Sequence, residues 1–179
     1  MYIPGHLSAG YLLVSATARW GGRRPPLLFA EVLPVLVGTL TPDIIDKGLL
    51  YLEITDHGRT IGHSVFTLMA LSAAAAVLFL VHRGAGKVMG FWLLGIGAHM
   101  ATDLVDDAVR GVLHGRQLLS SWFLWPFLDA SAWNLESAWE VFPGSRLYMA
   151  LEVAVVIGAV VVAGFHVWGK LGTGGEGGK

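Results

Sequence analysis

A histidine and an aspartate, His99 and Asp103, lie four residues apart in an otherwise apolar stretch of the chain. Four residues is just over one helical turn, so a helix here would project the imidazole and the carboxylate from the same face. Ionisable groups at membrane depth are expensive and by default indicate a functional site. The pair could be two ligands of one metal ion, or a ligand and its partner. The alternative is a buried hydrogen bond that tightens a helix bundle.

Other candidate metal ligands lie near the ends of further apolar segments: His6, Asp43, His57 and His63. The chain has seven histidines and no cysteine, so any metal site must be built from imidazole and carboxylate groups. This ligand set suits zinc, manganese or iron(II), and zinc is the first choice. Because there are more than four candidate ligands, we predict one or two divalent ions.

The composition indicates a membrane protein. The chain has 179 residues, of which 54% are hydrophobic and only 14% charged. Soluble domains are about 25% charged, so this chain has too little polar surface for water on all sides. A net charge of −1 argues against a nucleic-acid partner. We assign residues 1–170 to a single membrane-embedded domain and residues 171–179 to a disordered Gly-rich tail.

Apolar segments predict an all-α, polytopic bundle of four to five membrane helices, at residues 5–20, 26–41, 63–82, 88–109 and 148–169. A full crossing needs about 20 apolar residues. The third and fifth segments qualify readily, and the fourth qualifies if its polar end leaves the hydrocarbon. The first two are short and could be tilted, kinked at Pro34 or only partly inserted. Pro42 predicts the end of the second helix and a rigid corner that presents Asp43.

The charges between the segments predict an orientation. Three junctions are basic and contain no acid before Glu176, with Arg19, Arg23, Arg24, His82, Arg83, Lys87 and Lys170. By the positive-inside rule these junctions face the cytoplasm. The protein would then be a multi-pass protein of the cytoplasmic (inner) membrane, with its N-terminus outside and its C-terminus inside. Every candidate ligand falls on the extracytoplasmic side, which is the strongest internal argument for one shared site.

The long connection between residues 111 and 148 is rich in aromatic residues: Trp122, Phe123, Trp125, Phe127, Trp133, Trp139 and Phe142. Aromatic side chains favour the membrane interface. We therefore predict short interfacial helices on the outer leaflet, near the site, where they could hold a lipid headgroup.

A few charged residues can be interpreted in more than one way. The planar guanidinium of Arg59 suits a phosphate or a carboxylate, and an ion pair with Asp56 or Asp46 is the alternative. Asp46 itself fits simple turn chemistry. Glu31 and Glu152 could be a proton relay, partners of the ligands or helix-packing residues, and the sequence leaves their role open.

Several of these pieces together resemble the YdjM-like family of LexA-regulated, membrane-bound, metal-dependent hydrolases. The pieces are Gly5-His6, Thr41-Pro42-Asp43, His57 to Arg59, Gly62-His63-Ser64, His99-x-x-x-Asp103 and Ser121 to Phe127. The resemblance covers roughly residues 5 to 127, and the family is distantly similar to zinc-dependent phospholipase C. It implies metal ligands at His6, Asp43, His63, His99 and Asp103, with His57 possible.

This sequence departs from the family pattern in two places. Gly5 stands where the family usually has Thr, and the spacing from His57 to His63 is one residue longer than the typical form. No equivalent of the later His-x-x-x-Glu ligands of the phospholipase is evident, which favours one or two ions over three.

We therefore expect a metal-dependent hydrolase that cleaves a phosphoester of a membrane lipid, a phospholipid or a polyprenyl phosphate, with a metal-activated water. The expected catalytic residues are Asp43, Arg59, His63 and Asp103, and the expected substrate-binding residues are Arg59, Ser64, Trp122 and Trp125. The alternatives are a non-catalytic, metal-stabilised adaptor, a metal or proton transporter, and a hydrolase of peptide bonds.

Overall fold

The computed structural model describes residues 3–20, 25–114, 121–128 and 146–173. All regular elements among them are helical, which confirms the predicted all-α class. The α-helices are α1 (Ile3–Trp20), α2 (Leu33–Tyr51), α3 (Val65–Val81), α4 (Arg83–His114) and α6 (Arg146–Thr173). A π-helical turn, η1 (Leu28–Val32), precedes α2, and the 3-10 turns η2 (Ile61–His63) and η3 (Ser121–Leu124) lie in the connections.

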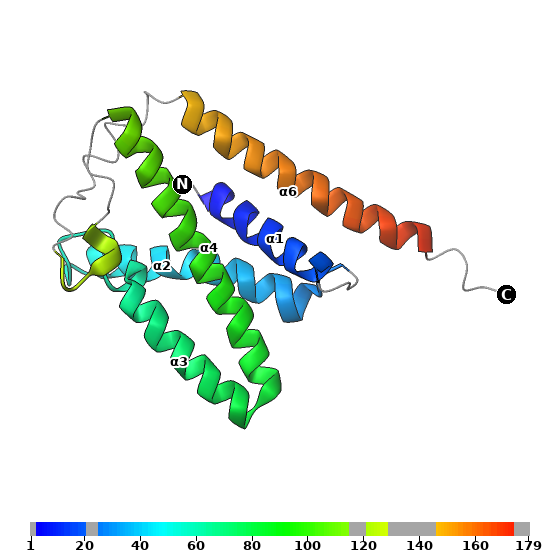
Figure 1. The fold of residues 1–179 in the computed structure, drawn as a ribbon, viewed down its shortest axis with the longest axis horizontal. Helices are drawn as coiled ribbons and strands as arrows, with labels where there is room; N and C mark the ends of the chain where they lie inside the picture. Colours follow the sequence, from blue (N-terminus) through cyan, green and yellow to red (C-terminus); the bar gives the residue numbers. More distant parts are fainter. Residues whose placement is uncertain (1–2, 21–24, 115–120, 129–145, 174–179) are drawn as a thin grey trace.

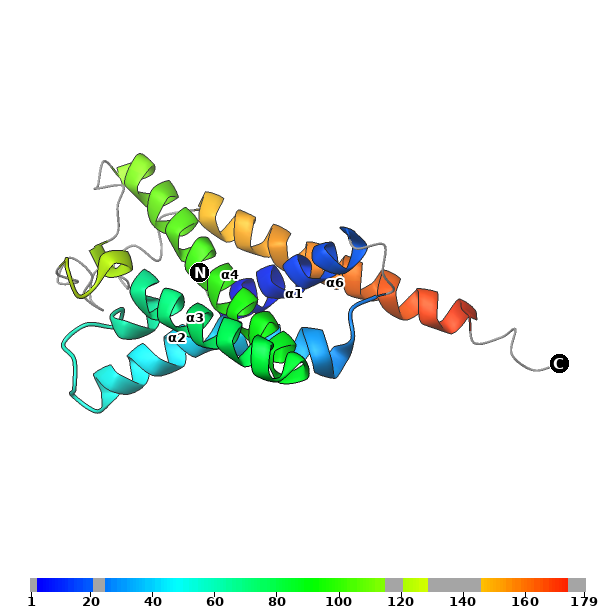
Figure 2. The ribbon, with the colours of Figure 1, turned by 60° about the horizontal axis from the view of Figure 1, so that its bottom comes forward.

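Helix α4 runs through the centre of the bundle and contacts α1, α2 and α3 (Figure 1). Helix α6 packs along α1 on the side away from α3. In both ribbon views, the N-terminal end of α1, the C-terminal end of α2 and the start of α3 lie toward the left (Figures 1 and 2). The α3–α4 junction and the C-terminal end of α6 lie away from them.

Helices α2 and α4 cross at two glycines. A Cβ atom on Gly38 would lie 2.0 Å from the carbonyl oxygen of Trp92, and one on Gly95 would lie 2.1 Å from that of Val35. Any larger residue at either position would push the two backbones apart. This close approach brings the backbone of α2 within reach of His99, which lies one turn beyond Gly95 on α4.

The prediction that Pro42 ends its helix is wrong, because α2 continues through Pro42 to Tyr51. A proline inside a helix removes one backbone hydrogen bond, but neighbouring polar groups can satisfy the disturbed turn in a membrane bundle. Here Nδ1 of His99 donates to the carbonyl oxygen of Thr39 at 2.7 Å, and the Thr41 hydroxyl donates to that of Val37 at 2.8 Å. These two carbonyls flank the carbonyl of Gly38, which is the one that Pro42 leaves without its helical donor. Pro34, by contrast, lies in the first turn of α2, where a proline is readily accommodated.

Among the described residues, three helical stretches are long and apolar enough to cross a membrane: Leu28–Tyr51, Arg83–Val109 and Ala150–Trp168. The second predicted segment is therefore longer than expected, because η1 and α2 together extend it to 24 residues. Helix α3 is apolar but has only 17 residues, the lower end of the range of about 17–25 for a crossing. Helix α1 is not among the three stretches.

The last two long helices extend beyond their predicted bounds. Helix α4 reaches His114, and α6 extends to Thr173, so residues 171–173 are helical rather than part of a tail. Residues 174–179 lie outside the described residues, as do Trp133, Trp139 and Phe142. Of the predicted interfacial helices, the described residues contain η3, which carries Trp122 and Phe123.

Candidate metal centre

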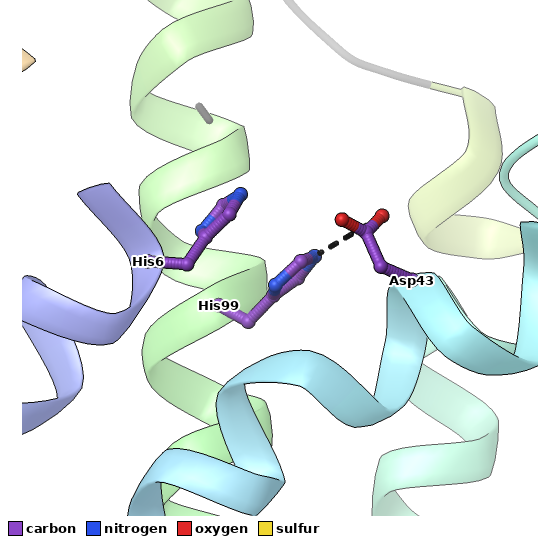
Figure 3. A group of neighbouring side chains, drawn as sticks. All are labelled: His6, Asp43 and His99. Carbon is purple, nitrogen blue, oxygen red and sulfur yellow. Dashed lines mark ion pairs between the residues drawn. The ribbon is translucent and has the colours of Figure 1, made fainter. Parts of the chain in front are cut away.

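Five of the six predicted ligands converge from four elements of the bundle. Their ligand atoms form two overlapping groups, each with all atoms within 4.8 Å of one another: His6, Asp43 and His99, and His63, His99 and Asp103. Figure 3 shows the first group, with His6 on α1, Asp43 on α2 and His99 on α4 pointing toward one another. The rings of His6 and His99 are stacked, with centroids 3.9 Å apart. His57 belongs to neither group.

The Nδ1 atoms of the three histidines are held by hydrogen bonds on the outside of the cluster. His63 Nδ1 lies 2.7 Å from a carboxylate oxygen of Asp46, and His99 Nδ1 lies 2.7 Å from the carbonyl oxygen of Thr39. Neither acceptor can donate, so both Nδ1 atoms carry hydrogen. This arrangement fixes the ring orientation and is the usual support of a metal-bound histidine.

The same reasoning assigns the tautomer of His6. Its Nδ1 lies 2.8 Å from the hydroxyl oxygen of Thr102, and that hydroxyl donates its hydrogen to the carbonyl oxygen of His99 at 2.8 Å. Nδ1 of His6 must therefore be the donor, and Nε2 carries the lone pair. This Nε2 atom is buried, has no hydrogen-bond partner among the described residues, and lies 3.4 Å from a carboxylate oxygen of Asp103.

All three Nε2 atoms thus face the interior of the cluster. Those of His63 and His99 are 3.0 Å apart, and each lies 3.5 Å from Oδ2 of Asp103. Two imidazole nitrogens at this distance need a proton or a cation between them, since two lone pairs would repel. The buried, partnerless Nε2 of His6 adds a third donor of the type that zinc binds. The residues present therefore fit a divalent cation.

His63 lies in η2, outside the apolar stretches. Burial lowers its pKa, but interactions with the carboxylates of Asp103 and Asp46 outweigh burial and raise the pKa above the usual 6.5. Without a cation, His63 therefore holds a proton at Nε2 more tightly than an ordinary imidazole does. A bound cation would have to displace that proton.

Asp46 holds the loop that carries His63. It has no exposed surface and accepts hydrogen bonds from the backbone amides of Thr60 and Gly62 at 2.7 and 2.8 Å, and from the Thr60 hydroxyl at 3.0 Å. A Cβ atom on Gly62 would lie 2.6 Å from the carbonyl oxygen of Pro42, so the loop requires glycine there. Asp46 is therefore a positioning residue rather than a turn residue.

The signal for Asp46 was its spacing of three residues from Asp43, which places both carboxylates on one helical face. Sequence reasoning missed it because the helix was expected to end at Pro42.

Arg59 holds the other side of the centre. Its Nη2 lies 2.8 Å from Oδ2 of Asp103, and its Nη1 lies 3.4 Å from Asp107. These partners differ from the expected Asp56 or Asp46. The guanidinium also lies 5.2 Å from the ring centroid of Trp122, whose indole nitrogen donates to Asp107 at 2.8 Å. With only 7% of its surface exposed, Arg59 orients a candidate ligand from within the protein.

The remaining predicted substrate-binding residues lie beneath or beside the site. Trp122 is fully buried and packs edge-on against the ring of His63. The buried Ser64 hydroxyl donates to the carbonyl oxygen of Trp125 at 2.5 Å and accepts from the Phe66 amide, which caps α3. Trp125 is half-buried. In this structure Ser64 and Trp122 therefore support the centre and join η3 to it.

The model of the YdjM inner membrane protein family matches residues 1–170. The chain therefore belongs to this family, and it is an inner membrane protein with three helices able to cross a membrane. No curated protein and no solved structure shows a significant match.

Proposed function

We propose that this member of the YdjM family is a membrane-embedded, metal-dependent hydrolase that cleaves a phosphoester of a lipid, a phospholipid or a polyprenyl phosphate. The observation that carries the proposal is the set of three imidazole Nε2 atoms that face two carboxylates, each ring fixed through its Nδ1 atom. Binding of a cation requires this orientation, whereas tightening of a helix bundle does not.

The ligand set favours zinc, with manganese or iron(II) as alternatives. Either group of three offers enough donors for one zinc ion. The number of ions is limited because the two groups share a residue. His99 belongs to both groups, and its single free nitrogen, Nε2, can bind one ion. A second ion would be left with one imidazole and one carboxylate of the other group, so we favour one ion.

When bound, such an ion supplies a water whose pKa is lowered toward neutrality and a positive charge that polarises a phosphoryl oxygen. The chain's own residues would hold the ion and exclude bulk water: His6, His63, His99 and Asp103 are each 1% exposed or less. Arg59 would keep Asp103 oriented toward the centre through their ion pair.

The location of the centre supports action at the extracytoplasmic face. Basic residues lie at the C-terminal end of α1, at the α3–α4 junction and near the C-terminal end of α6, and these parts of the bundle are away from the ligand-bearing parts of the helices (Figure 1). By the positive-inside rule, the basic end faces the cytoplasm and the centre faces the opposite side. A reagent that labels single cysteines only from outside tests this, with Asp56→Cys expected to react and Lys87→Cys expected to be protected.

The direct test of the activity starts with metal analysis of the protein purified in detergent. We expect about one zinc per chain, hydrolysis of at least one phospholipid or polyprenyl phosphate, and loss of both in His99→Ala. His57→Ala is the matched control, because His57 lies nearby but outside both ligand groups. Zinc bound at full occupancy without turnover of any lipid phosphoester would refute the hydrolase proposal.

A second candidate function is a metal-stabilised membrane protein without catalysis. The near-complete burial of four of the five candidate ligands favours it, because structural metal sites are closed. It predicts that chelation lowers the thermal unfolding midpoint while no lipid is turned over.

A further inference from the structure

The five candidate ligands differ in their access to the outside. Four side chains are 1% exposed or less, whereas the side chain of Asp43 is 17% exposed. The two oxygens of its carboxylate have different neighbours. Oδ1 lies 3.7 Å from Nε2 of His63 and 4.0 Å from Nε2 of His99, inside the centre. A molecule that approaches the centre therefore meets it at Asp43.

A lysine stands at this opening. The ammonium of Lys47, one helical turn after Asp43, lies 2.8 Å from Oδ2 of Asp43, and the Lys47 side chain is 60% exposed. Lys47 thus pairs with the outer oxygen of a candidate ligand carboxylate while its own side chain is exposed. Arg59 differs, because it is buried and its two terminal nitrogens face Asp103 and Asp107.

The helical surface beside Lys47 is apolar. Ile44 is 67% exposed, Ile45 is 38% exposed, and Tyr51 one turn further on is 88% exposed. All lie in the stretch Leu28–Tyr51, which is apolar and long enough to cross a membrane. An anion that binds at Lys47 therefore has apolar surface next to it, which a free inorganic ion would leave unused.

We propose that Lys47 recognises the phosphate group of an amphiphilic substrate at the entrance of the metal centre. This inference rests on the proposed function. When Asp43 serves as a metal ligand, part of its charge is shared with the ion, so its pairing with Lys47 weakens. The ammonium then exchanges the carboxylate oxygen for a phosphate oxygen, and Ile44 and Ile45 contact the apolar chain.

The experiment uses the full chain in a non-ionic detergent, with Lys47→Gln as the test variant. Lys87→Gln is the control, because Lys87 is also exposed but lies at the start of α4, by the α3–α4 junction. Zinc binding is measured first, by competition with a chelator. Binding of two probes to the zinc-loaded protein is then measured by calorimetry: a short-chain phosphatidate and inorganic phosphate.

For the phosphatidate, we expect Lys47→Gln to weaken binding about tenfold, because a charge-assisted hydrogen bond is lost. Zinc should bind Lys47→Gln as well as the wild type or up to about fivefold more tightly, because the competing surface ion pair with Asp43 is gone. Lys87→Gln should match the wild type in both measurements. Lys47→Arg should retain phosphatidate binding, because it keeps the positive charge.

The outcomes separate the two proposals. If the wild type binds no zinc, the proposed function fails and this inference falls with it. If zinc binds normally but phosphatidate affinity stays within twofold in Lys47→Gln, only the role of Lys47 is overturned. If inorganic phosphate binds as tightly as phosphatidate, the amphiphile is excluded as the preferred ligand. Zinc binding also reports folding, and Lys47→Met replaces Lys47→Gln if that variant fails to fold.

Discussion

Asp43 and Asp103 are two carboxylates of one candidate metal centre, yet the protein holds them in different ways. Asp103 is 1% exposed and pairs with the buried Arg59 at 2.8 Å. Asp43 is 17% exposed and pairs with Lys47, which is 60% exposed, at the same distance. The pairs are alike in length, so distance alone does not separate their roles.

Burial does separate them. An ion pair in water contributes little, because solvent screens both charges and the lysine stem must be ordered. A buried pair cannot lose one partner without leaving an uncompensated charge in a medium of low dielectric constant. The Asp103 side of the centre is therefore held rigidly by a buried ion pair, whereas the carboxylate of Asp43 can exchange its partner.

The largest expected effect is that of Asp103→Asn. Zinc affinity should fall at least about a hundredfold, because one ligand charge disappears from the second ligand group. The metal-free protein should also lose about 3 kcal/mol of stability, since the buried Arg59 loses its 2.8 Å ion pair with the carboxylate of Asp103. Chelator competition and thermal unfolding in detergent measure the two effects. Asp56→Asn, at an exposed position, is the control and should change neither.

A positioning effect of intermediate size is expected for Asp46→Asn. The two carboxylate oxygens of Asp46 each accept from two donors, whereas the amide of Asn has one oxygen and an NH2 group that donates. One pair of donors, either His63 Nδ1 with the Thr60 amide or the Thr60 hydroxyl with the Gly62 amide, therefore loses its acceptor. Loss of such a partner weakens metal affinity by about 10–100-fold. The metal count should stay the same, which separates Asp46 from a ligand. A variant that loses zinc altogether at saturating concentration would assign Asp46 to the ligands instead.

The sequence predicted the buried ligands of the centre better than its exposed side at Asp43 and Lys47. His99 and Asp103 are four residues apart on one helix, so their common face follows from helical geometry alone. The convergence with His6 and His63 followed from their positions at the ends of apolar segments, once the basic junctions fixed which ends belong together.

The continuation of α2 through Pro42 could not be predicted from the local sequence. Pro42 favours a helix end, but the crossing at Gly38 and Gly95 and the hydrogen bond from His99 to Thr39 support a continuous helix. These are contacts between residues about sixty positions apart, which no window of sequence contains. The error hid the one-turn relation between Asp43 and Lys47, and with it the entrance.

The partners of Arg59 were missed for the same reason. The ion pair considered from the sequence was with Asp56 or Asp46, as the alternative to a phosphate or carboxylate ligand, whereas Asp103 and Asp107 reach Arg59 through the fold. Their spacing of four residues on α4 was visible, but nothing in the sequence showed that the loop before α3 folds onto this face of α4.

Competition between a proton and zinc at His63 should give a smaller effect, a gradual change of stability and zinc affinity with pH. The raised pKa of His63 means that the metal-free protein gains stability from the protonated form below pH 6.5 and loses it as pH rises through the folded-state value. Zinc must displace this proton, so its affinity should fall by up to about tenfold per pH unit on the acid side of that value.

The proton of His63 thus makes the metal-free protein lose stability as pH rises from 6.5 through the folded-state pKa, whereas it makes the zinc-bound protein lose stability as pH falls below 6.5. Thermal unfolding midpoints with and without zinc, recorded between pH 5.5 and 8, test this. Parallel slopes would show that the proton of His63 and the cation do not compete.

The smallest expected effect is that of Asp43→Asn on the stability of the metal-free protein. Asp43→Asn removes an exposed pairing, so the metal-free protein should change in stability by less than about 1 kcal/mol, against about 3 kcal/mol for Asp103→Asn. Zinc affinity should nevertheless fall clearly in both variants, because each removes a charged donor from one ligand group. The ratio of stability loss to affinity loss thus distinguishes a ligand that is also structural from one that is free to exchange Lys47 for a cation and a substrate anion. If Asp43→Asn destabilised the metal-free protein as much as Asp103→Asn, the two sides of the centre would be equally fixed, and an entrance at Asp43 would be ruled out.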